Sequence, residues 1–230
     1  MDSSATLSVI IPTLDEAADI EAQLGGLQAL RDHGIEIVVV DGGSQDDTFA
    51  LAAPLASLVI SSAAGRARQM NVGAQASRGN VLLFLHADTR LPDGAVDRIQ
   101  QALADGCQWG RFDVRLEGRH PMLKVIALAM NLRSRLTGIA TGDQALFTTR
   151  QAFEAIGGFP EQPLMEDIEI SKRLKRLSRP ACVRPCVVSS ARRWERHGLW
   201  STMLQMWHLR YRYWRGIDSR QLAEEYRHAR

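Results

Sequence analysis

Short, almost continuously apolar segments that alternate with helix-like segments are the feature that most constrains the fold of this chain. The apolar segments cover residues 7–11, 35–40, 58–61 and 81–85. The helix-like segments cover residues 15–30, 46–53 and 65–76. Strands that are apolar along their whole length and are separated by helices are typical of a parallel sheet covered on both faces. The first 105 or so residues therefore predict an open α/β sheet of the nucleotide-binding kind.

The pattern changes after about residue 106. Residues 109–116 and 144–149 alternate like half-buried strands, and a helical stretch over 121–136 lies between them. We therefore expect an α/β fold with an open, mostly parallel sheet, helices on both faces and a mixed sheet in the second half.

The chain has 230 residues, 45% of them hydrophobic and 23% charged, which excludes disorder, collagen-like repeats and a small disulfide scaffold. The sequence has no linker long enough to separate two domains and no internal repeat. We therefore expect one domain over 1–198, with a nucleotide-binding half over about 1–105 and an acceptor half over about 106–198. A helical extension over 199–230 follows.

Cysteine usage and the amino-terminal residues predict a cytoplasmic protein. Cys107, Cys182 and Cys186 make an odd count, and residues 1–6 lack the basic and apolar parts of a signal peptide. Cys182 and Cys186 have no nearby His or second Cys pair, which favours small buried side chains over a zinc site. No apolar run reaches the 18 or so residues that span a bilayer. The formal net charge of +2 argues against a nucleic-acid surface.

Acidic residues follow three of the predicted strands. Asp15 and Glu16 come after the first strand, Asp41 after the second, and Asp88 after the strand at 81–85. Ligands of open α/β sheets bind beyond the carboxyl ends of the strands, so these carboxylates are expected at one edge. They repel one another there unless a cation or hydrogen-bond donors compensate.

Helix capping is an alternative role for some of these residues. Thr13 with Glu16 matches the capping-box spacing T-x-x-E, and Ser44 with Asp47 matches S-x-x-D. Both roles remain open for them.

Asp41 and Asp88 are not placed as caps. Asp88 beside a strand end is a candidate ligand of Mg²⁺, which prefers carboxylate and phosphate oxygens. Asp41 is suited to accept hydrogen bonds from a nucleoside. Arg66 and Arg68 lie on the first turns of the predicted helix at 65–76, where guanidinium groups and a helix N-terminus suit a diphosphate. A solvated helix face is the alternative.

Two later segments also carry polar residues suited to a site. The glycine-rich turn at 157–160 precedes Glu166, Asp167 and Glu169 in the first turn of another helix. These acids are either partners of the helix dipole or a catalytic carboxylate presented to a cleft. Residues 192–197 (RRWERH) add cations and an indole that suit phosphate and sugar or base contacts.

Taken together and in order, the motifs PTLDEA, VDGGSQDDT, HAD after a strand, GDQALF, GGFP with MED, and RRW resemble the family 2 glycosyltransferases of the GT-A fold. GRARQMNVGA, HAD in place of an acidic triplet, and RSRLTG with GDQ are similar to the radical-SAM/selenodomain-associated, or arsenosugar-biosynthesis-type, branch. The resemblance covers residues 7–214.

The resemblance implies a role for each matching residue. Asp88 holds a divalent cation, Mg²⁺ or Mn²⁺, although His86 replaces the first acid of the family's D-x-D triplet. Asp167 is the base. The residues expected to bind the donor are Pro12, Thr13, Asp15, Glu16, Asp41, Arg66, Arg68, Asn71, Ala87, Asp143, Gln144, Arg193 and Trp194. Arg193 and Trp194 stand where the family carries Q-x-x-R-W, without the Gln.

The function implied is inverting, metal-assisted transfer of a sugar from a nucleotide-diphosphate sugar, with a UDP-sugar favoured, to an acceptor hydroxyl. The acceptor is a small molecule or a lipid-linked one. Sugar-phosphate nucleotidyl transfer and a non-catalytic nucleotide-sugar-binding module are the alternatives. Residues 199–215 form either an amphipathic helix on the inner face of a membrane or a helix packed on the core with its arginines outside.

Overall fold

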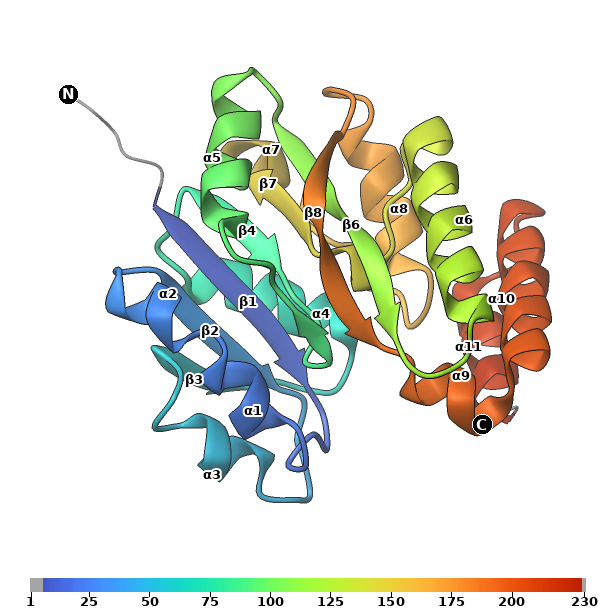
Figure 1. Ribbon diagram of the computed structural model, residues 1–230, viewed down its shortest axis with the longest axis horizontal. Coiled ribbons are helices and arrows are strands. Elements are labelled where there is room, and N and C mark those ends of the chain that lie inside the picture. Colours follow the sequence, from blue (N-terminus) through green and yellow to red (C-terminus); the bar gives the residue numbers. More distant parts are fainter. Residues whose placement is uncertain (1–5, 229–230) are drawn as a thin grey trace.

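The computed structural model describes residues 6–228, apart from the side chains of residues 193, 196, 197, 227 and 228. Its centre is an eight-stranded sheet in the order β3-β2-β1-β4-β7-β6-β8-β5 (Figure 1). The strands are β1 (Leu7–Thr13), β2 (Glu36–Asp41), β3 (Leu58–Ser61), β4 (Val81–Phe84), β5 (Thr89–Arg90), β6 (Trp109–Glu117), β7 (Leu146–Thr149) and β8 (Ala181–Ser190).

The sheet is parallel in its first half and mixed in its second, as the sequence predicts. β1 pairs in parallel with β2 on one side and β4 on the other, and β2 pairs in parallel with β3. β7 then runs antiparallel to both β4 and β6, while β6 and β8 are parallel. Because the strand order reverses at β1, the carboxyl ends of β1 and β4 flank a topological switch point, where ligands of such sheets bind.

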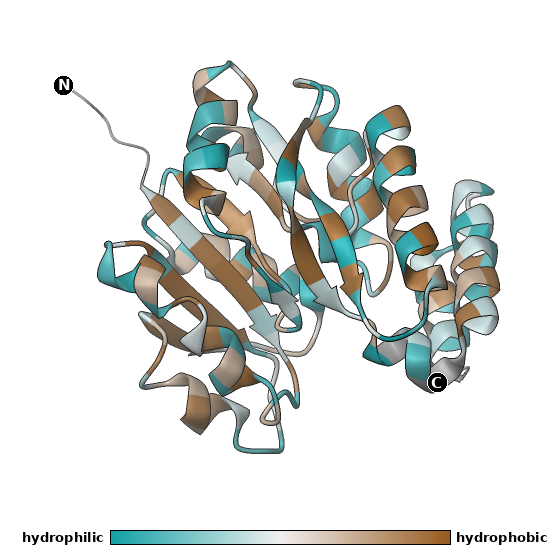
Figure 2. Ribbon diagram, viewed as in Figure 1, coloured by the Kyte–Doolittle hydropathy of each residue, from teal (hydrophilic) through white to brown (hydrophobic). Residues whose placement is uncertain are grey.

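Helices cover both faces of the sheet. The helices up to β8 are α1 (Ile20–Gly25), α2 (Gln28–Asp32), α3 (Thr48–Ala52), α4 (Arg66–Ala76), α5 (Ala95–Ala104), α6 (Met122–Thr137), α7 (Arg150–Ala155) and α8 (Glu166–Leu174). Helices α1, α3, α5 and α6 contribute to one buried apolar cluster, and α4, α7 and α8 to another. Alternate residues of β1 enter the two clusters, since Val9 and Ile11 face one and Ile10 faces the other. Figure 2 shows the apolar character of these central strands.

The expected helix over 15–30 differs from the structure. β1 continues through Thr13, the first helical residue is Ile20, and α1 ends at Gly25, after which Gly26 and Leu27 separate it from α2. The capping alternative for Thr13 and Glu16 is therefore wrong, because no helix begins there. Two adjacent glycines lower helix stability, which explains the interruption.

Capping by Asp47 is also not observed. Asp47 precedes α3 but makes no side-chain cap hydrogen bond, and the Ser44 hydroxyl donates to Asp41 instead.

The carboxyl-terminal segment folds as α9 (Arg192–His197), α10 (Leu199–Trp214) and α11 (Ser219–His228). Leu209 of α10 and Leu222 of α11 pack with Met165, the residue before α8, in a third apolar cluster. Thus the segment expected as an extension contacts the loop that leads into α8. Among residues 6–228, no helix has the length and apolar content needed to span a membrane.

Candidate active site

A cleft of about 770 Å³ lies beyond the carboxyl ends of β1 and β4 and extends to the carboxyl-terminal helices. A large part of the predicted site lies together in this cleft. The predicted residues that line the cleft are Pro12, Asp15, Glu16, Arg66, Ala87, Asp88, Asp143 and Asp167. They come from the ends of β1 and β4, the start of α4, the turn before β7 and the start of α8, segments that are distant in sequence.

Asp88 follows β4 and is half-buried in the cleft. Its carboxylate accepts one long hydrogen bond, 3.4 Å from the Thr89 hydroxyl, and has no ion-pair partner within the described part of the chain. No group of three or more His, Cys, Asp or Glu among the described residues is arranged to hold a metal by itself. A single open carboxylate fits a hard cation that takes its remaining ligands from phosphate oxygens and water.

His86 lies two residues before Asp88 and lines the same cleft. Its Nδ1 lies 3.5 Å from an Asp143 carboxylate oxygen, and its ring packs against Gly142. A Cβ on residue 142 would lie 2.1 Å from His86 Cε1, so only glycine fits beside this ring. The loop after β4 and the turn before β7 are therefore in direct contact through His86.

Asp167 lies in the first turn of α8 and lines the same cleft. One carboxylate oxygen accepts a hydrogen bond from the Gly142 amide at 3.3 Å, and the other from the Ile168 amide at 2.7 Å. These two amides fix the orientation of the carboxylate. A carboxylate held on the cleft wall is suited to remove a proton from a hydroxyl bound within hydrogen-bond distance.

Backbone strain is present on both sides of this cleft. Asp15 has φ 53° and Met165 has φ 66°, in the left-handed region that non-glycine residues rarely adopt. Both residues line the cleft. Strained backbone of this kind costs of order 1–3 kcal/mol per residue and clusters at functional sites, which supports the assignment of the cleft.

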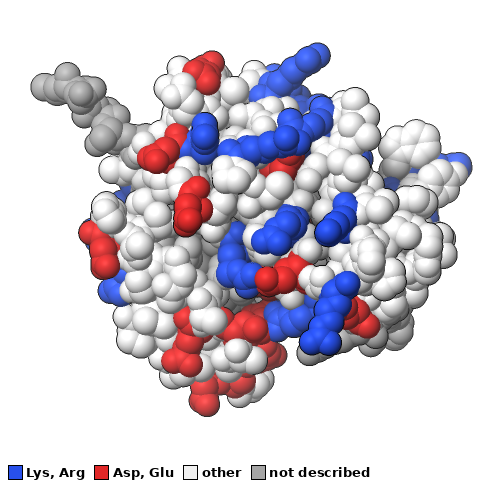
Figure 3. Space-filling model, in the orientation of Figure 1, with Lys and Arg blue, Asp and Glu red and all other residues white. Residues whose placement is uncertain are grey.

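The acidic edge is partly compensated by Arg192, the first residue of the RRWERH segment, which the sequence suggested for phosphate contacts. Its guanidinium pairs with Asp19 and lies 3.6 Å from a Glu16 oxygen. Burial raises the pKa of Glu16 above its usual range, Arg192 opposes this, and Asp88 and Asp19 add to it. Figure 3 shows acidic side chains gathered at the lower left of this face and basic ones across its centre.

Glu166, beside Asp167, is buried and 6% exposed, and it pairs with Arg66 at 3.4 Å. Burial raises the pKa of Glu166 above its usual range, although Arg66 opposes the shift. A carboxyl whose pKa is raised on folding gives stability that is present below its ordinary pKa and lost as pH rises through the raised value. Ionised Glu166 therefore lowers the stability of the protein at neutral and alkaline pH.

We expect Glu166→Gln to unfold at a higher denaturant concentration than wild type at pH 8, with the difference shrinking as pH falls toward 5. Arg66 is 55% exposed and stays solvated without its partner, so little is lost on that side. The matched control is Glu161→Gln. Glu161 is the exposed partner of Arg68, which is on the same helix as Arg66, so the stability of this variant relative to wild type should not change with pH in this way. Lower stability of Glu166→Gln at pH 8 would contradict this account.

Some predicted donor-binding residues do not line the cleft. Thr13 is 2% exposed, and its hydroxyl donates to the Val40 carbonyl at 3.5 Å. Asp41 accepts hydrogen bonds from Gly43 and Ser44 and so shapes the loop after β2. The structure gives these two side chains roles in holding the strand ends.

The side chains of three other predicted donor-binding residues interact with other parts of the protein. Asn71 exchanges hydrogen bonds with the Phe159 backbone at 2.8 and 2.9 Å. Gln144 is fully buried, where it caps Thr141 and contacts Asn131. Arg68 pairs with Glu161 at the surface, beside a separate pocket.

Of the two residues predicted in the RRW segment, the structure describes the side chain of only one. Trp194 packs partly buried against the first apolar cluster and does not line the cleft. The Arg193 side chain falls outside the described residues.

The carboxyl-terminal helices supply cleft residues that sequence reasoning missed. They are Met206 and Arg210 of α10 and Tyr226 of α11. The alternative in which the helix packs on the core with its arginines outside does not hold for Arg210, which lines the cleft, and Arg212 pairs with Glu225 of α11. Nothing in the local pattern distinguishes these arginines, because their contacts depend on how α10 packs.

A sequence model described as Glycosyl transferase family 2 matches residues 8–155. An uncharacterized protein of Mycobacterium tuberculosis is 33% identical over 104 residues, which cover 43% of this chain and 33% of that protein. The chain thus spans about a third of the length of this curated relative.

Two solved structures share the fold. The mannosyltransferase PcManGT from Pyrobaculum calidifontis, in complex with GDP-Man and Mn²⁺, has a TM-score of 0.62 and 22% identity over 82% of this chain and 59% of its own. Glucosyl-3-phosphoglycerate synthase from Mycobacterium tuberculosis, in complex with Mn²⁺, UDP and phosphoglyceric acid, has a TM-score of 0.58 and 22% identity over 82% of this chain and 68% of its own.

Proposed function

The chain belongs to glycosyl transferase family 2, and on this premise we propose that it transfers a sugar from a nucleotide-diphosphate sugar to an acceptor hydroxyl with inversion. The observation that carries the proposal is the meeting of Asp88 and Asp167 in one cleft at the switch point of the sheet. These are the two groups that the reaction needs, one beside the leaving diphosphate and one beside the acceptor.

Each group has a defined task. The acceptor oxygen forms a bond to the anomeric carbon as the bond from that carbon to the diphosphate breaks, and the electron pair leaves with the nucleoside diphosphate. Asp167 takes the proton of the acceptor hydroxyl. A divalent cation, Mg²⁺ or Mn²⁺, held by Asp88 would supply charge stabilisation for the leaving diphosphate. Arg66, which also lines the cleft, adds positive charge there.

The donor and the subfamily are finer parts of the proposal. The two similar structures hold GDP-Man, a nucleoside-diphosphate sugar, and UDP, a nucleoside diphosphate, each together with Mn²⁺. We expect a UDP-sugar for this chain. The motifs GRARQMNVGA and HAD support membership of the radical-SAM/selenodomain-associated branch within the family.

A donor screen tests the proposal. UDP- and GDP-sugars are incubated with the full chain and Mg²⁺, Mn²⁺ or a chelator, and the released nucleotide is identified. Metal-dependent release of a nucleoside diphosphate is expected, and the anomeric configuration of the product reports inversion. Release of pyrophosphate would indicate nucleotidyl transfer instead. Donor binding without release in the presence of diverse acceptors would indicate a binding module.

We further propose that α10 rests on an anionic membrane surface near the site. Its outward side carries a stripe of large apolar residues that are 55–76% exposed: Trp200, Leu204, Trp207, Tyr211 and Trp214. The neighbouring α6 carries a second stripe, 54–77% exposed: Val125, Leu128, Leu132 and Leu136. Continuous exposed apolar faces of this kind mark interaction sites.

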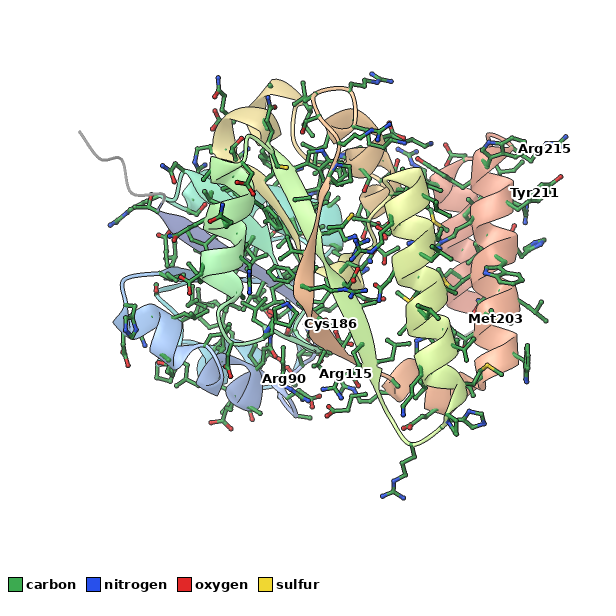
Figure 4. All side chains as sticks on the ribbon, turned by 45° about the horizontal axis from the view of Figure 1, so that its top comes forward. Arg90, Arg115, Cys186, Met203, Tyr211 and Arg215 are labelled. Atoms are coloured by element: carbon green, nitrogen blue, oxygen red, sulfur yellow. The ribbon has the colours of Figure 1, made fainter. Side chains whose placement is uncertain are left out.

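Charge favours a lipid surface as the occupant of these stripes. Residues 192–230 hold nine arginines and four acids, whereas the preceding residues hold 19 basic and 22 acidic ones. Figure 4 shows Tyr211 and Arg215 pointing away from the body of the molecule at one end of α10. Indole and phenol rings flanked by arginine are typical of helices that lie in the headgroup region.

We expect Trp207→Glu to reduce binding to phosphatidylglycerol vesicles about tenfold or more, since burial of a large apolar side chain contributes about 1.5–3 kcal/mol. Co-sedimentation at low salt measures the effect. The control is Phe49→Glu on α3, which is 41% exposed and lies at the opposite end of the molecule (Figure 1). Absence of vesicle binding by wild type, or concentration-dependent dimer formation through these stripes, would reject the membrane proposal.

A further inference from the structure

Two arginines on neighbouring helices are close enough to interact electrostatically, and one of them lines the cleft. Arg133 is on α6 and Arg210 is on α10, helices that stand side by side in Figures 1 and 4. Arg210 lines the cleft together with Asp143 and Asp167. Burial, followed by the charge of Arg210, lowers the pKa of Arg133 to about 10, while Asp167 and Asp143 oppose the shift. Arg133 therefore interacts electrostatically with the same groups.

Both guanidinium groups have unused donors. Nε and Nη2 of Arg133 and Nε of Arg210 are buried and have no hydrogen-bond partner among the described residues. Neither arginine forms an ion pair with a carboxylate in the described ranges. Burial of a cation or of its N–H donors without a partner is costly, and a second cation beside it adds to the cost. An arrangement of this kind is explained if a bound anion supplies the missing acceptors.

The nearby buried acid cannot serve as that anion. Asp113 of β6 is 1% exposed and already accepts hydrogen bonds from Arg111, Arg135 and Arg184. Burial alone would raise the pKa of Asp113, but the three guanidinium groups outweigh it and hold that pKa below its usual range. Three cations thus share one carboxylate, and the acceptor half of the molecule holds a surplus of positive charge.

The position of the pair relative to Asp167 identifies what it binds. The acids at the ends of β1 and β4, with Asp88, occupy the part of the cleft assigned to the cation and the diphosphate, whereas Arg210 belongs to the wall formed by the carboxyl-terminal helices. Guanidinium groups bind phosphate and carboxylate through paired hydrogen bonds.

We propose that Arg133 and Arg210 bind an anionic group, a phosphate or a carboxylate, on the acceptor and so hold the acceptor hydroxyl beside Asp167. This inference rests on the proposed transferase function, because it names the class of acceptor for the same cleft. The anion belongs either to a soluble phosphate ester or carboxylate or to a lipid headgroup, which share the chemistry that the two arginines recognise.

Titration of the full chain with inorganic phosphate tests the inference. Binding is followed by calorimetry with Mg²⁺ and UDP present at saturation, so that the donor part of the cleft is filled. We expect phosphate to bind wild type, and Arg133→Gln and Arg210→Gln each to weaken that binding about tenfold or more, as for loss of charged hydrogen bonds. The matched control is Arg98→Gln, which removes an exposed arginine of α5 that does not line the cleft.

Separate readings distinguish the two proposals. Failure of UDP to bind in the presence of Mg²⁺ would count against the transferase proposal, while phosphate titration without UDP would still report on the arginine pair. Equal phosphate binding by wild type and both variants would overturn the inference. Weaker UDP binding by the variants, with phosphate binding unchanged, would assign the pair to the donor and also overturn it.

The melting temperature of the variants and the choice of phosphate probe are the remaining parts of the test. Because no described partner loses a hydrogen bond, Arg133→Gln should melt at or above the temperature of wild type, and a clear decrease would mean that Arg133 is structural. Glycerol 3-phosphate and phosphatidylcholine vesicles with and without phosphatidic acid are then compared. Arg133-dependent binding of either phosphate probe supports the inference, and the preferred probe identifies the soluble or lipid source. Binding of neither probe would reject it.

Discussion

Replacement of Asp167 by Asn is expected to lower turnover by about 10²–10⁴, the usual range for loss of a general base. The amide keeps the size of the side chain and one oxygen that can accept a hydrogen bond from the Ile168 amide. It cannot take the proton of the acceptor hydroxyl. Binding of UDP and the divalent cation should remain close to that of wild type, because Asp88 is unchanged.

Steady-state release of nucleoside diphosphate and calorimetric titration with UDP measure the two quantities separately. Asp97→Asn is the matched control, since Asp97 is an exposed acid in the first turn of α5, outside the cleft. Near-normal transfer by Asp167→Asn would exclude Asp167 as the base.

Replacement of Asp88 by Asn is expected to abolish the tightening of UDP binding by Mg²⁺ or Mn²⁺ and to lower turnover by about 10²–10³, as for loss of one transition-state charge stabiliser. The reason is that Asp88 has no ion-pair partner in the described residues, and that no group of three or more His, Cys, Asp or Glu among those residues could hold the metal in its place. Removal of the metal with a chelator should bring wild type to the level of the variant.

The control for this experiment is Asp93→Asn, an exposed acid five residues further along. UDP affinity of wild type and Asp88→Asn is compared with and without metal. If the variant kept full metal dependence, another group would hold the cation, and the role of Asp88 would be wrong.

The first half of the fold follows from local patterns. Strands buried on both faces give apolar runs, so β1, β2 and β4 are recognisable from composition alone. β8 was missed because it carries Arg184, Pro185 and two serines, and its burial alternates irregularly. The helix expected over 15–30 is too long, because apolar spacing reports helical periodicity and not the destabilising effect of the adjacent glycines Gly25 and Gly26.

The candidate site was predictable where chemistry lies at strand ends and unpredictable where packing decides. Asp88 follows a recognisable strand, Asp167 lies in the first turn of a recognisable helix, and both line the cleft. Asn71 and Gln144 have the right chemistry for a ligand, but their amides bind backbone and side chains of the protein. Arg133 and Arg210 were not selected because their proximity depends on the contact between distant helices, which leaves no trace in local sequence.

The contact between His86 and Gly142 has an evolutionary consequence. The imidazole ring fills the space that a Cβ at position 142 would occupy. The two positions are therefore not independent: any larger residue at 142 requires a smaller or displaced side chain at 86. A descendant that exchanged His86 for a small acid would release this steric constraint and open position 142 to substitution. Substitutions at positions 86 and 142 are thus expected to be coupled.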